Sequence, residues 1–416
     1  MTTIPGLGDI PSSWQTKRAK WLLNRQRRQV RPQDGIVTAF RDGQVTLRDN
    51  RRTDGFTNAV HEIGYQGVRK GDLVVHGMDG FAGAIGVSDS DGKASPVVHA
   101  YKPTGQMDAR FAAYALRTMA LNGYVATLAK GIRERSTAFD SATLANVQLP
   151  VPPLNEQRRI ADFLDRETAR LTQIERLARK AGELASQRRT AVIDAELQSL
   201  PDEKILPVTA ACQLVMDCVN KTAPIEATET PYRMIRTSNV RGGRVDVEDT
   251  YRVSEETFRT WNRRGAPLVG DVLFTRQAPV GEAGLLTSAA PVFLGQQVML
   301  YRANPKRITP EFLLYNFLSS FMKRQFALAS DGAAHAHMRV HDCLKLRIYC
   351  PSLDRQREMA ARVRGELDHA DRLRAATTQQ ISLVTERRHT IIIAALTGQF
   401  DVTTASGRNV TEGVAV

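Results

Sequence analysis

The sequence has few of the features that mark secreted, membrane-spanning or metal-binding proteins. Its four cysteines show no Cys-x-x-Cys spacing and have no histidines arranged beside them as zinc ligands. The longest apolar run, residues 391–396, is far shorter than the roughly 20 residues that cross a bilayer. The N-terminus lacks the apolar stretch of a secretory signal. We therefore expect a soluble cytoplasmic protein with reduced thiols, no membrane association and no bound metal.

Sequence motifs of catalysis are also missing. A phosphate-binding loop needs G-x-x-x-x-G-K-[ST], but the nearest stretch, Gly86 to Lys93, has five residues between its glycines and is followed by Ala94. The glycines of residues 80–86 have the wrong spacing for a dinucleotide fingerprint. Residues 201–204 superficially resemble a nuclease motif, but they follow a predicted helix, and we interpret them as a linker. The sequence thus predicts a non-catalytic chain that binds no cofactor of its own.

The charge of the chain is strongly positive. Lysine and arginine number 57 against 44 acidic residues, which gives a net charge of +13 and a pI of about 9.8. Such an excess favours a polyanionic partner, because neutralising phosphates releases counterions. A merely basic soluble protein remains the alternative on charge alone.

The chain repeats itself at a spacing of 199 residues. A Pro-x-Leu-x-x-Gln-Arg pattern at 152–158 returns at 351–357. Two copies of one unit fill almost all of the 416 residues. A chain built in this way presents two similar surfaces, which indicates a two-part target. Further matches at the same spacing pair 187–189 with 386–388, and Gly71-Asp72 with Gly270-Asp271.

Each copy consists of a mixed region of about 150 residues and a charged, alanine-rich helical region of about 45. The predicted fold class is α+β, with two similar mixed globules, each followed by a long helix. The predicted domains are a first globule at 1–150, a helical spacer at 151–200, a second globule at 201–349, a second spacer at 350–400, and a disordered tail at 401–416.

Turn residues and β-branched residues predict short strands in both globules, and spaced aromatic residues predict one core helix in each, at 108–121 and 309–325. The two helices match at an offset of 201, so loop lengths differ between the copies. We assign their aromatic residues to the core. The predicted strands are 43–47 and 71–75 in the first copy, and 243–247, 270–274 and 297–301 in the second.

The helical regions carry apolar residues every seven positions, with a second row offset by three or four, as in a coiled-coil seam. Asn155 and Asp354 are predicted N-caps, and Gly398 is a predicted C-terminal stop. Forty-odd helical residues span roughly 60 Å, or less if the first helix breaks near Asp165. The seam residues are Leu164, Leu171, Ile174 and Val192 in the first copy, and Val363, Leu373, Val384 and Ile391 in the second.

Charges within the seam favour antiparallel packing of the two helices. Glu167 and Glu366 are equivalent, and so are Arg188 and Arg387. Antiparallel helices would place Glu167 opposite Arg387 and Glu366 opposite Arg188, whereas parallel helices would stack like charges. The alternative, that all four are solvated surface charges, stays open.

Three basic patches are candidates for contact with nucleic acid. The first, around Trp14 and Trp21, is interpreted as an amphipathic helix whose basic side either faces phosphates or is simply solvated. Arginine, asparagine and glutamine can read base edges, while other cations position the backbone. The candidates are Arg27 and Arg28; Arg51, Arg52, Lys130 and Arg133; and Arg236, Asn239, Arg241, Arg244, Arg276, Gln277, His335, His337 and Arg339.

Several segments resemble the specificity (S) subunits of type I restriction–modification systems. The Pro-x-Pro-Pro-Leu-x-Glu-Gln start ending at Gln157, with Ile160-Ala161 and Leu164-Asp165 after it, is similar to the first conserved helical region of that family. Residues 386–398 are similar to the end of the second, and Ile10-Pro11-Ser-Ser-Trp14 to a common start of such chains. The second region departs from the pattern with Arg355 in place of Glu156.

The resemblance implies that each globule reads one half of a bipartite, asymmetric site in double-stranded DNA. It also implies that the two helices pack as an antiparallel coiled coil that fixes the spacing of the half-sites. The chain would bind two methyltransferase (M) subunits, which use S-adenosylmethionine, and a larger complex would add ATP-driven restriction (R) subunits. The alternatives are a coiled-coil adaptor that binds only protein, and a divergent stand-alone DNA methyltransferase.

Overall fold

Two units share the chain, and each combines a globule with parts of both long helices. The computed structural model describes residues 1–51, 62–128, 139–200, 204–226, 229–277, 279–330 and 337–399, with Ser330 described by its backbone only. Unit 1 comprises the described residues of 1–177 and 380–416, and unit 2 those of 178–379. The predicted tail at 401–416 lies outside the described residues, and the predicted domain boundaries stay predictions.

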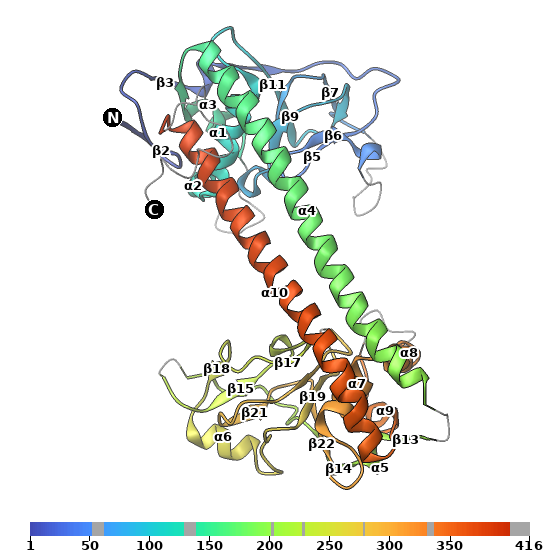
Figure 1. Cartoon of the computed structure of the whole chain (residues 1–416). Coiled ribbons are helices and arrows are strands. Elements are labelled where there is room, and N and C mark those ends of the chain that lie inside the picture. Colours follow the sequence, from blue (N-terminus) through green and yellow to red (C-terminus); the bar gives the residue numbers. More distant parts are fainter. Residues whose placement is uncertain are drawn as a thin grey trace. The chain divides into compact units, whose positions relative to one another are not determined.

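The centre of unit 1 is an antiparallel sheet in the order β4-β11-β8-β9, with smaller strand pairs β1-β2, β3-β12, β5-β6 and β7-β10 around it (Figure 1). Its strands are β1 Thr2–Ile4, β2 Gly8–Ile10, β3 Gln15–Arg18, β4 Leu23–Gln26, β5 Val37–Ala39, β6 Val45–Leu47, β7 Gln66–Val68, β8 Leu73–His76, β9 Ile85–Val87, β10 Gly92–Ala94, β11 Val98–Pro103 and β12 Gln148–Val151. Its helices are α1 Ala109–Leu121, α2 Tyr124–Thr127, α3 Ser141–Asn146 and the first part of α4 Leu154–Gln198, which continues into unit 2.

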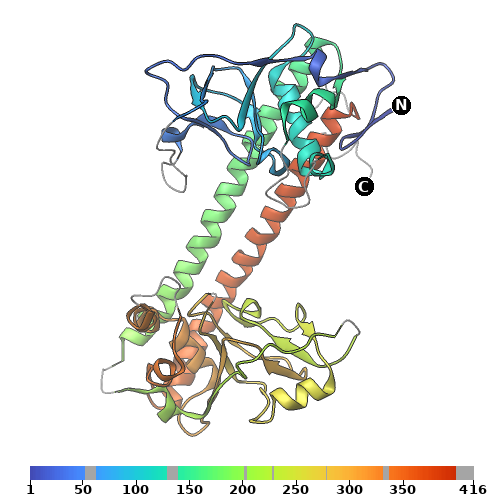
Figure 2. The same cartoon turned by 180° about the vertical axis from the view of Figure 1, so that it is seen from behind.

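Unit 2 repeats the four-stranded core of unit 1 and extends it by two strands, one of them parallel to its neighbour. Its sheet has the order β14-β22-β19-β20-β17-β16, beside the sheet β18-β15-β21 and the pair β13-β23 (Figure 2). Its strands are β13 Ile205–Pro207, β14 Cys212–Asp217, β15 Arg233–Ile235, β16 Val240–Arg241, β17 Gly243–Val245, β18 Tyr251–Arg252, β19 Val272–Thr275, β20 Ala283–Leu285, β21 Val292–Leu294, β22 Val298–Ala303 and β23 Arg347–Tyr349. Its helices are α5 Val208–Ala211, α6 Glu255–Trp261, α7 Pro310–Leu318, α8 Ser320–Ser330, α9 Val340–Leu344 and part of α10 Leu353–Leu396.

The element order confirms the predicted α+β class. In both units the central strands lead into a core helix (α1 or α7), two further helices, a closing strand (β12 or β23) and then a long helix, α4 or α10. Most of the predicted core aromatics are buried, with Phe111 and Phe317 fully inaccessible, while Tyr114 is only half-buried. The predicted helix at 309–325 is wrong in one respect: it breaks at Ser319, whose backbone is extended and whose hydroxyl accepts a hydrogen bond from the Met322 amide in α8.

The repeated Gly-Asp pair is a structural turn before a strand. Gly71 and Gly270 have φ of 89° and 93°, a conformation that suits glycine, so β8 and β19 begin later than predicted. The Asp72 and Asp271 carboxylates each accept a hydrogen bond from the backbone amide three residues earlier. Each also pairs with an arginine, and these arginines come from different places in the two copies. The turn is thus repeated, and both aspartates form an ion pair, but the arginine comes from a different strand region in each copy: Arg28 after β4 in unit 1 and Arg302 of β22 in unit 2.

A buried glutamine joins the start of each long helix to its globule. The Gln157 side chain accepts from the Asp108 amide at 2.9 Å and donates to the Gln106 and Pro152 carbonyls. Gln356 makes the same three kinds of bond, with Thr309, Arg307 and Pro351. Both side chains are fully buried. This shared network explains why the Pro-x-Leu-x-x-Gln pattern recurs.

Within each unit the parts of α4 and α10 lie side by side and run antiparallel (Figures 1 and 2). In unit 2, Arg188 pairs with Glu366 at 2.7 Å, and Glu196, later in α4, pairs with Arg362, earlier in α10. The predicted antiparallel register and the Arg188–Glu366 pair are therefore confirmed. In unit 1, Glu167 lies 3.9 Å from Arg170, and its predicted pairing with Arg387 stays a prediction.

The predicted seam is mostly covered. Leu164, Leu171, Val363, Val384 and Ile391 are buried, while Ile174 and Val192 are half-buried. Leu373 is a correction, since it is 40% exposed. Around it the buried stripe of α10 passes through Ala370 and Thr377, so the second row of the heptad has no covering side chain there.

The helix ends test the predicted caps. Asn155 and Asp354 lie inside the first turns of α4 and α10, so they are not N-caps, and the Ser352 hydroxyl accepts from the Arg355 amide instead. Gly398 is a C-terminal stop, as predicted. It has φ of 64°, and the Gln399 amide donates to the Ala394 carbonyl across it. Helix α4 is continuous through Asp165, so the shorter span considered for a helix broken at that residue does not apply.

Among the described residues, no helix combines the length and the apolar character that crossing a bilayer requires.

Candidate nucleic-acid interface

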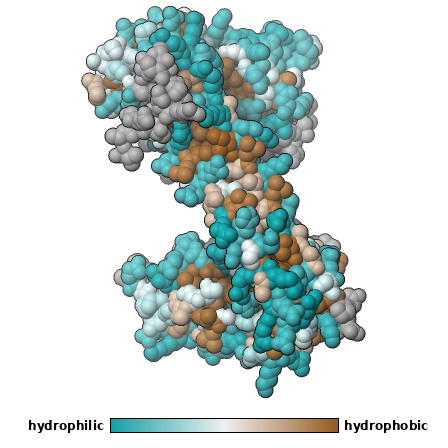
Figure 3. Space-filling view, in the orientation of Figure 1, coloured by the Kyte–Doolittle hydropathy of each residue, from teal (hydrophilic) through white to brown (hydrophobic). Residues whose placement is uncertain are grey.

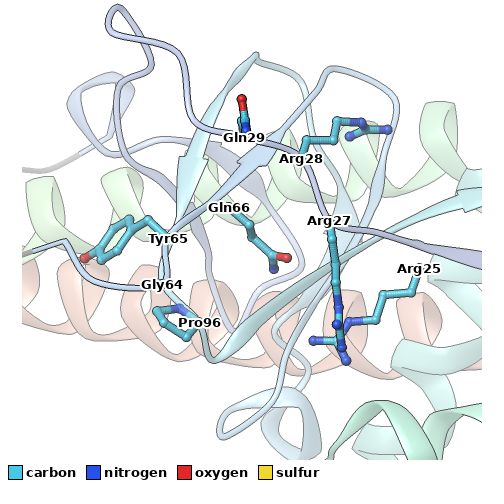
Figure 4. Close-up of a pocket in the computed structure, with 8 residues that line it drawn as sticks. All are labelled: Arg25, Arg27, Arg28, Gln29, Gly64, Tyr65, Gln66 and Pro96. Atoms are coloured by element: carbon cyan, nitrogen blue, oxygen red, sulfur yellow. The ribbon is translucent and has the colours of Figure 1, made fainter.

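A basic pocket lies at one edge of the unit 1 globule, where β4 ends (Figure 4). Its volume is about 410 Å³. Residues from β4 and its continuation form one side, and the start of β7 and the turn before β11 form the other. The lining residues are Arg25, Arg27, Arg28, Gln29, Gly64, Tyr65, Gln66 and Pro96.

Arg25 belongs to strand β4, and Arg27 and Arg28 follow the end of that strand, which corrects the predicted amphipathic helix in the first patch. Residues 15–18 and 23–26 form β3 and β4, each paired in register with another strand. Arg25 stands opposite Tyr101 of β11, so the sheet fixes the position of its backbone. Strand alternation puts Arg25 and Arg27 on one face and Arg28 on the other.

The three arginines have different surroundings. Arg25 is exposed and donates a hydrogen bond to Ser141 Oγ at 2.7 Å. Arg27 is exposed, and its side chain and that of Arg25 point toward the same place in Figure 4. Arg28 instead pairs with the buried Asp72, with a second bond of 3.1 Å to Oδ1. The Arg28 guanidinium therefore holds the Gly-Asp turn, and its contact with DNA stays a prediction.

Close backbone packing shapes the other side of the pocket. The Gly67 amide donates to the Arg28 carbonyl at 2.8 Å, and a Cβ on Gly67 would come within 2.9 Å of the Gln29 carbonyl oxygen. Gln66 donates from Nε2 to the Val98 carbonyl, which orients its side chain. Glycine at position 67 thus lets β7 lie against the continuation of β4.

Two buried groups on β11 lie on the sheet face that carries Arg25 and Arg27. His99 is 8% exposed, and its Nδ1 is buried without a hydrogen-bond partner among the described residues. Burial, with a contribution from Arg25, lowers the pKa of His99 to about 4. Burial also raises the pKa of Tyr101 to about 12. Both side chains are therefore uncharged near neutral pH, and the positive charge at this edge belongs to the arginines.

Unit 2 carries different chemistry at the equivalent position. The Arg276 amide donates to the Gln297 carbonyl as the Gly77 amide donates to Val97, so Arg276 corresponds to Gly77. In the strand ladder, Met216 stands opposite Leu300 as Gln26 stands opposite Ala100. The next residues along, Arg27 and Asp217, are thus equivalent. The duplicated fold places an arginine in one unit where the other has an aspartate.

Asp217 is neutralised inside unit 2. Arg276 is 5% exposed and donates to Asp217 at 3.1 Å, and it also donates to the Met338 carbonyl. His337 Nε2 lies 3.5 Å from Arg276 Nη1, and Gln277 forms a β-bridge with His337. The sequence prediction that Arg276 reads a base is corrected, since its guanidinium is buried in this network.

Other predicted contact residues are also used within the fold. Asn239 is 3% exposed, and its side chain bonds the Arg236 amide and the Asp249 carbonyl, so it is corrected to a structural role. The Arg236 guanidinium stacks 4.0 Å from the Tyr251 ring centre. Arg51 pairs with Asp42 and stacks on Phe40. These interactions hold both guanidiniums against the protein.

Exposed candidates remain on unit 2. Arg241 and Arg244 flank the turn between β16 and β17, and Arg339 precedes α9; all three are exposed. Arg244 pairs with Asp371 at 3.2 Å while remaining 75% exposed. Arg52, Lys130, Arg133 and His335 lie outside the described residues.

Sequence reasoning missed Gln29, Tyr65 and Gln66. Gln29 is close to Arg25 in the sequence but carries no charge. Tyr65 and Gln66 lie about 40 residues away, and only the folding of the chain brings them to the pocket. The available signal was the spacing of Gly64 and Gly67 around Tyr65 and Gln66. Within the described ranges, no group of three or more histidine, cysteine or acidic side chains could hold a metal ion.

Comparison with known proteins gives concordant matches. A family model described as the type I restriction modification DNA specificity domain matches residues 71–182. The type I restriction enzyme EcoBI specificity subunit of Escherichia coli is 22% identical over 285 residues, which cover 63% of this chain and 60% of that protein. The type I restriction enzyme MjaVIII specificity subunit of Methanocaldococcus jannaschii is 22% identical over 280 residues, covering 63% and 64%. The chain thus spans less than two thirds of the length of these relatives.

A solved chain from a study of complex assembly and conformational transition of the type I R-M system has a similar fold. It superposes with a TM-score of 0.59 at 16% identity, over 94% of this chain and 100% of that one. At this identity the likeness concerns the fold alone.

Proposed function

Because this chain belongs to the family of type I restriction–modification specificity subunits, we propose that it is the DNA-reading subunit of such a complex. Each globule reads one half of a bipartite, asymmetric site in double-stranded DNA. The two long helices set the spacing between the half-sites and carry the partner subunits. The net charge of +13 supports a polyanionic partner.

The observation that carries this proposal is a repeated fold with different side chains at equivalent places. Both units have the same order of four core strands, a core helix after them and a buried glutamine. Yet Arg27 in unit 1 corresponds to Asp217 in unit 2, and Gly77 corresponds to Arg276. A repeat with a constant frame and different surface chemistry suits a target whose halves differ in sequence.

The long helices offer surface for the partner subunits. Hydrophilic side chains dominate the face in Figure 3, and hydrophobic groups gather along the helices. Four helix leucines are at least 40% exposed: Leu177 and Leu383 in unit 1, and Leu184 and Leu373 in unit 2. Exposed leucines of this kind support protein partners. The partners proposed are two methyltransferase subunits and, in a restriction complex, translocating restriction subunits.

The chemistry of such a complex belongs to the partner subunits. We assign S-adenosylmethionine to the methyltransferase subunits and ATP to the restriction subunits, and no cofactor to this chain. A cytoplasmic location follows from a role on chromosomal DNA.

The test is single-molecule methylation sequencing of DNA from a host that expresses this chain with its methyltransferase subunit. The expected result is methylated adenine in a two-part motif with a fixed non-specific gap, absent when this chain is omitted. Methylation without a motif, or unchanged by omission of this chain, would contradict the proposal. A protein-only adaptor or a stand-alone methyltransferase would give those results.

A further inference from the structure

The pocket of unit 1 gathers positive charge that the fold leaves uncompensated. Arg25 and Arg27 are two residues apart on one face of the chain at the end of β4, and both are exposed. Within the part of the chain that the structure describes, neither forms an ion pair with a carboxylate, and Arg25 donates only to the Ser141 hydroxyl. Two guanidiniums directed to one place repel each other, and an anion between them removes that repulsion.

The walls of the pocket suit an oxyanion that belongs to a larger molecule. The volume of about 410 Å³ exceeds that of a small inorganic anion. Gln29, Gln66, Tyr65 and Pro96 also line the pocket, and the Gln66 side chain points toward Arg27 in Figure 4. Figure 4 shows Tyr65 and Pro96 across the pocket from Arg27. Arginine forks match phosphate oxygens in geometry and charge.

At the equivalent position of unit 2, an ion pair within the protein replaces the two exposed arginines. Asp217 stands where unit 1 has Arg27, and Arg276 neutralises it at 3.1 Å. The charge of this pair is satisfied within the protein. An anion approaching this place in unit 2 would meet a carboxylate instead of a second guanidinium.

Resting on the proposed DNA-reading function, we infer that the Arg25–Arg27 pocket binds a phosphodiester group of the DNA backbone, and that the equivalent place in unit 2 binds none. The pocket therefore anchors one half of the target without reading its sequence. DNA binding by unit 1 should therefore depend more strongly on salt concentration than DNA binding by unit 2, in addition to the difference in the bases that the two units read.

The experiment compares binding of the full chain to random-sequence duplex DNA over a range of salt concentrations. Removing one cation that neutralises a phosphate lowers the slope of log K against log salt by about 0.9, so R25Q/R27Q should lower it by about 1.8. Between about 50 and 200 mM salt, the unsubstituted chain should then lose about twelvefold more affinity than the variant does. The effect of the substitution should be the same for every duplex tested.

The matched control is R159Q/R166Q, which removes two exposed charges from α4 in the same unit. This control variant should have the same slope of log K against log salt as the unsubstituted chain, within experimental error. R25K/R27K guards against misfolding, because it keeps both charges and should keep most of the slope. A slope for R25Q/R27Q equal to that of the control overturns the inference. The inference is also overturned if R25Q/R27Q binds only particular DNA sequences more weakly while its slope of log K against log salt is unchanged, because that result would mean contact with a base.

Two further outcomes separate the alternatives. Inorganic phosphate, titrated alone, is the probe for a free-anion site. If it binds the unsubstituted chain but not R25Q/R27Q while DNA affinity is equal for both, the pocket holds a free anion and the inference fails. If the unsubstituted chain binds no duplex at all, the proposed function fails with it, whereas normal DNA binding by R25Q/R27Q overturns the pocket alone.

Discussion

At the residue scale, His99 couples the stability of unit 1 to pH. Its ring is 8% exposed on β11, and Nδ1 lacks a described partner. Burial lowers its pKa to about 4, and Arg25, His76 and Arg27 act in the same direction against the opposing Asp140. The unfolded state, with a pKa near 6.5, therefore binds more protons than the folded state between about pH 6.5 and 4.

The consequence is a loss of stability in acid. As the pH falls from about 6.5 to 4, the free energy of unfolding should fall by on the order of 2–3 kcal/mol through this residue. His99→Gln should remove that part of the pH dependence, whatever it does to absolute stability. His389→Gln, at an exposed histidine of α10 in the same unit, is the control and should keep the slope. Urea unfolding across this pH range checks it, and parallel pH profiles for H99Q and the unsubstituted chain would refute it.

Residue roles were the part of the site least accessible from sequence. The charge and the repeat indicated a DNA reader, but a list of arginines does not say which are free. Arg28, Arg276 and Asn239 carry the same functional groups as true contact residues, yet each holds a turn or a network inside the fold. Their partners are distant in sequence; Arg276 meets an aspartate 59 positions away. Burial of this kind depends on strand pairing, which composition does not encode.

At the element scale, the two glycines near and within α10 should respond oppositely to alanine. Gly398 has φ of 64°, and a Cβ there would come within 2.7 Å of Pro11 Cγ. Gly398→Ala should therefore cost about 1–2 kcal/mol. Gly365 is an exposed position inside the helix with no atom within 4 Å of an added Cβ. Gly365→Ala should stabilise the chain by up to about 1 kcal/mol.

Thermal unfolding of the two alanine variants checks this pair. Because the substitution is the same, a general effect of alanine cannot give opposite signs. Destabilisation by both variants would mean that the α10 backbone near Gly365 is not the regular helix described. Stabilisation by both would mean that the cap at Gly398 is not required.

Elements were largely predictable where their signal is local. Heptad spacing and the repeat predicted both long helices, and charge pairing predicted their antiparallel register, seen in Arg188 and Glu366. Gly398 predicted the end of α10. Residues 15–28 were misjudged as a helix because basic side chains around two tryptophans fit an amphipathic face. Their pairing with β12 and β11, more than 70 residues away, decides otherwise.

At the scale of the whole molecule, duplication keeps one frame and varies its surface. The buried glutamines, the Gly-Asp turns and the order of the four core strands recur in both units. Surface positions such as Arg27 and Asp217 do not. The repeated parts form hydrogen-bonded networks that tolerate little change. The proposed DNA specificity of one globule could therefore change without disturbing the helices that both globules share.

The spacing role that we propose for the two helices gives the last prediction. Deleting one heptad from each helix at facing positions, 178–184 from α4 and 376–382 from α10, keeps the seven-residue seam and removes about 10 Å of helix. At about 3.4 Å per base pair, the non-specific gap of the methylated motif should shorten by about three base pairs, while both half-sites stay the same. Methylation sequencing of the deletion variant reads this directly. Deleting the heptad from α4 alone mismatches the seam and should abolish methylation. An unchanged gap after the paired deletion would show that the helices do not set the spacing.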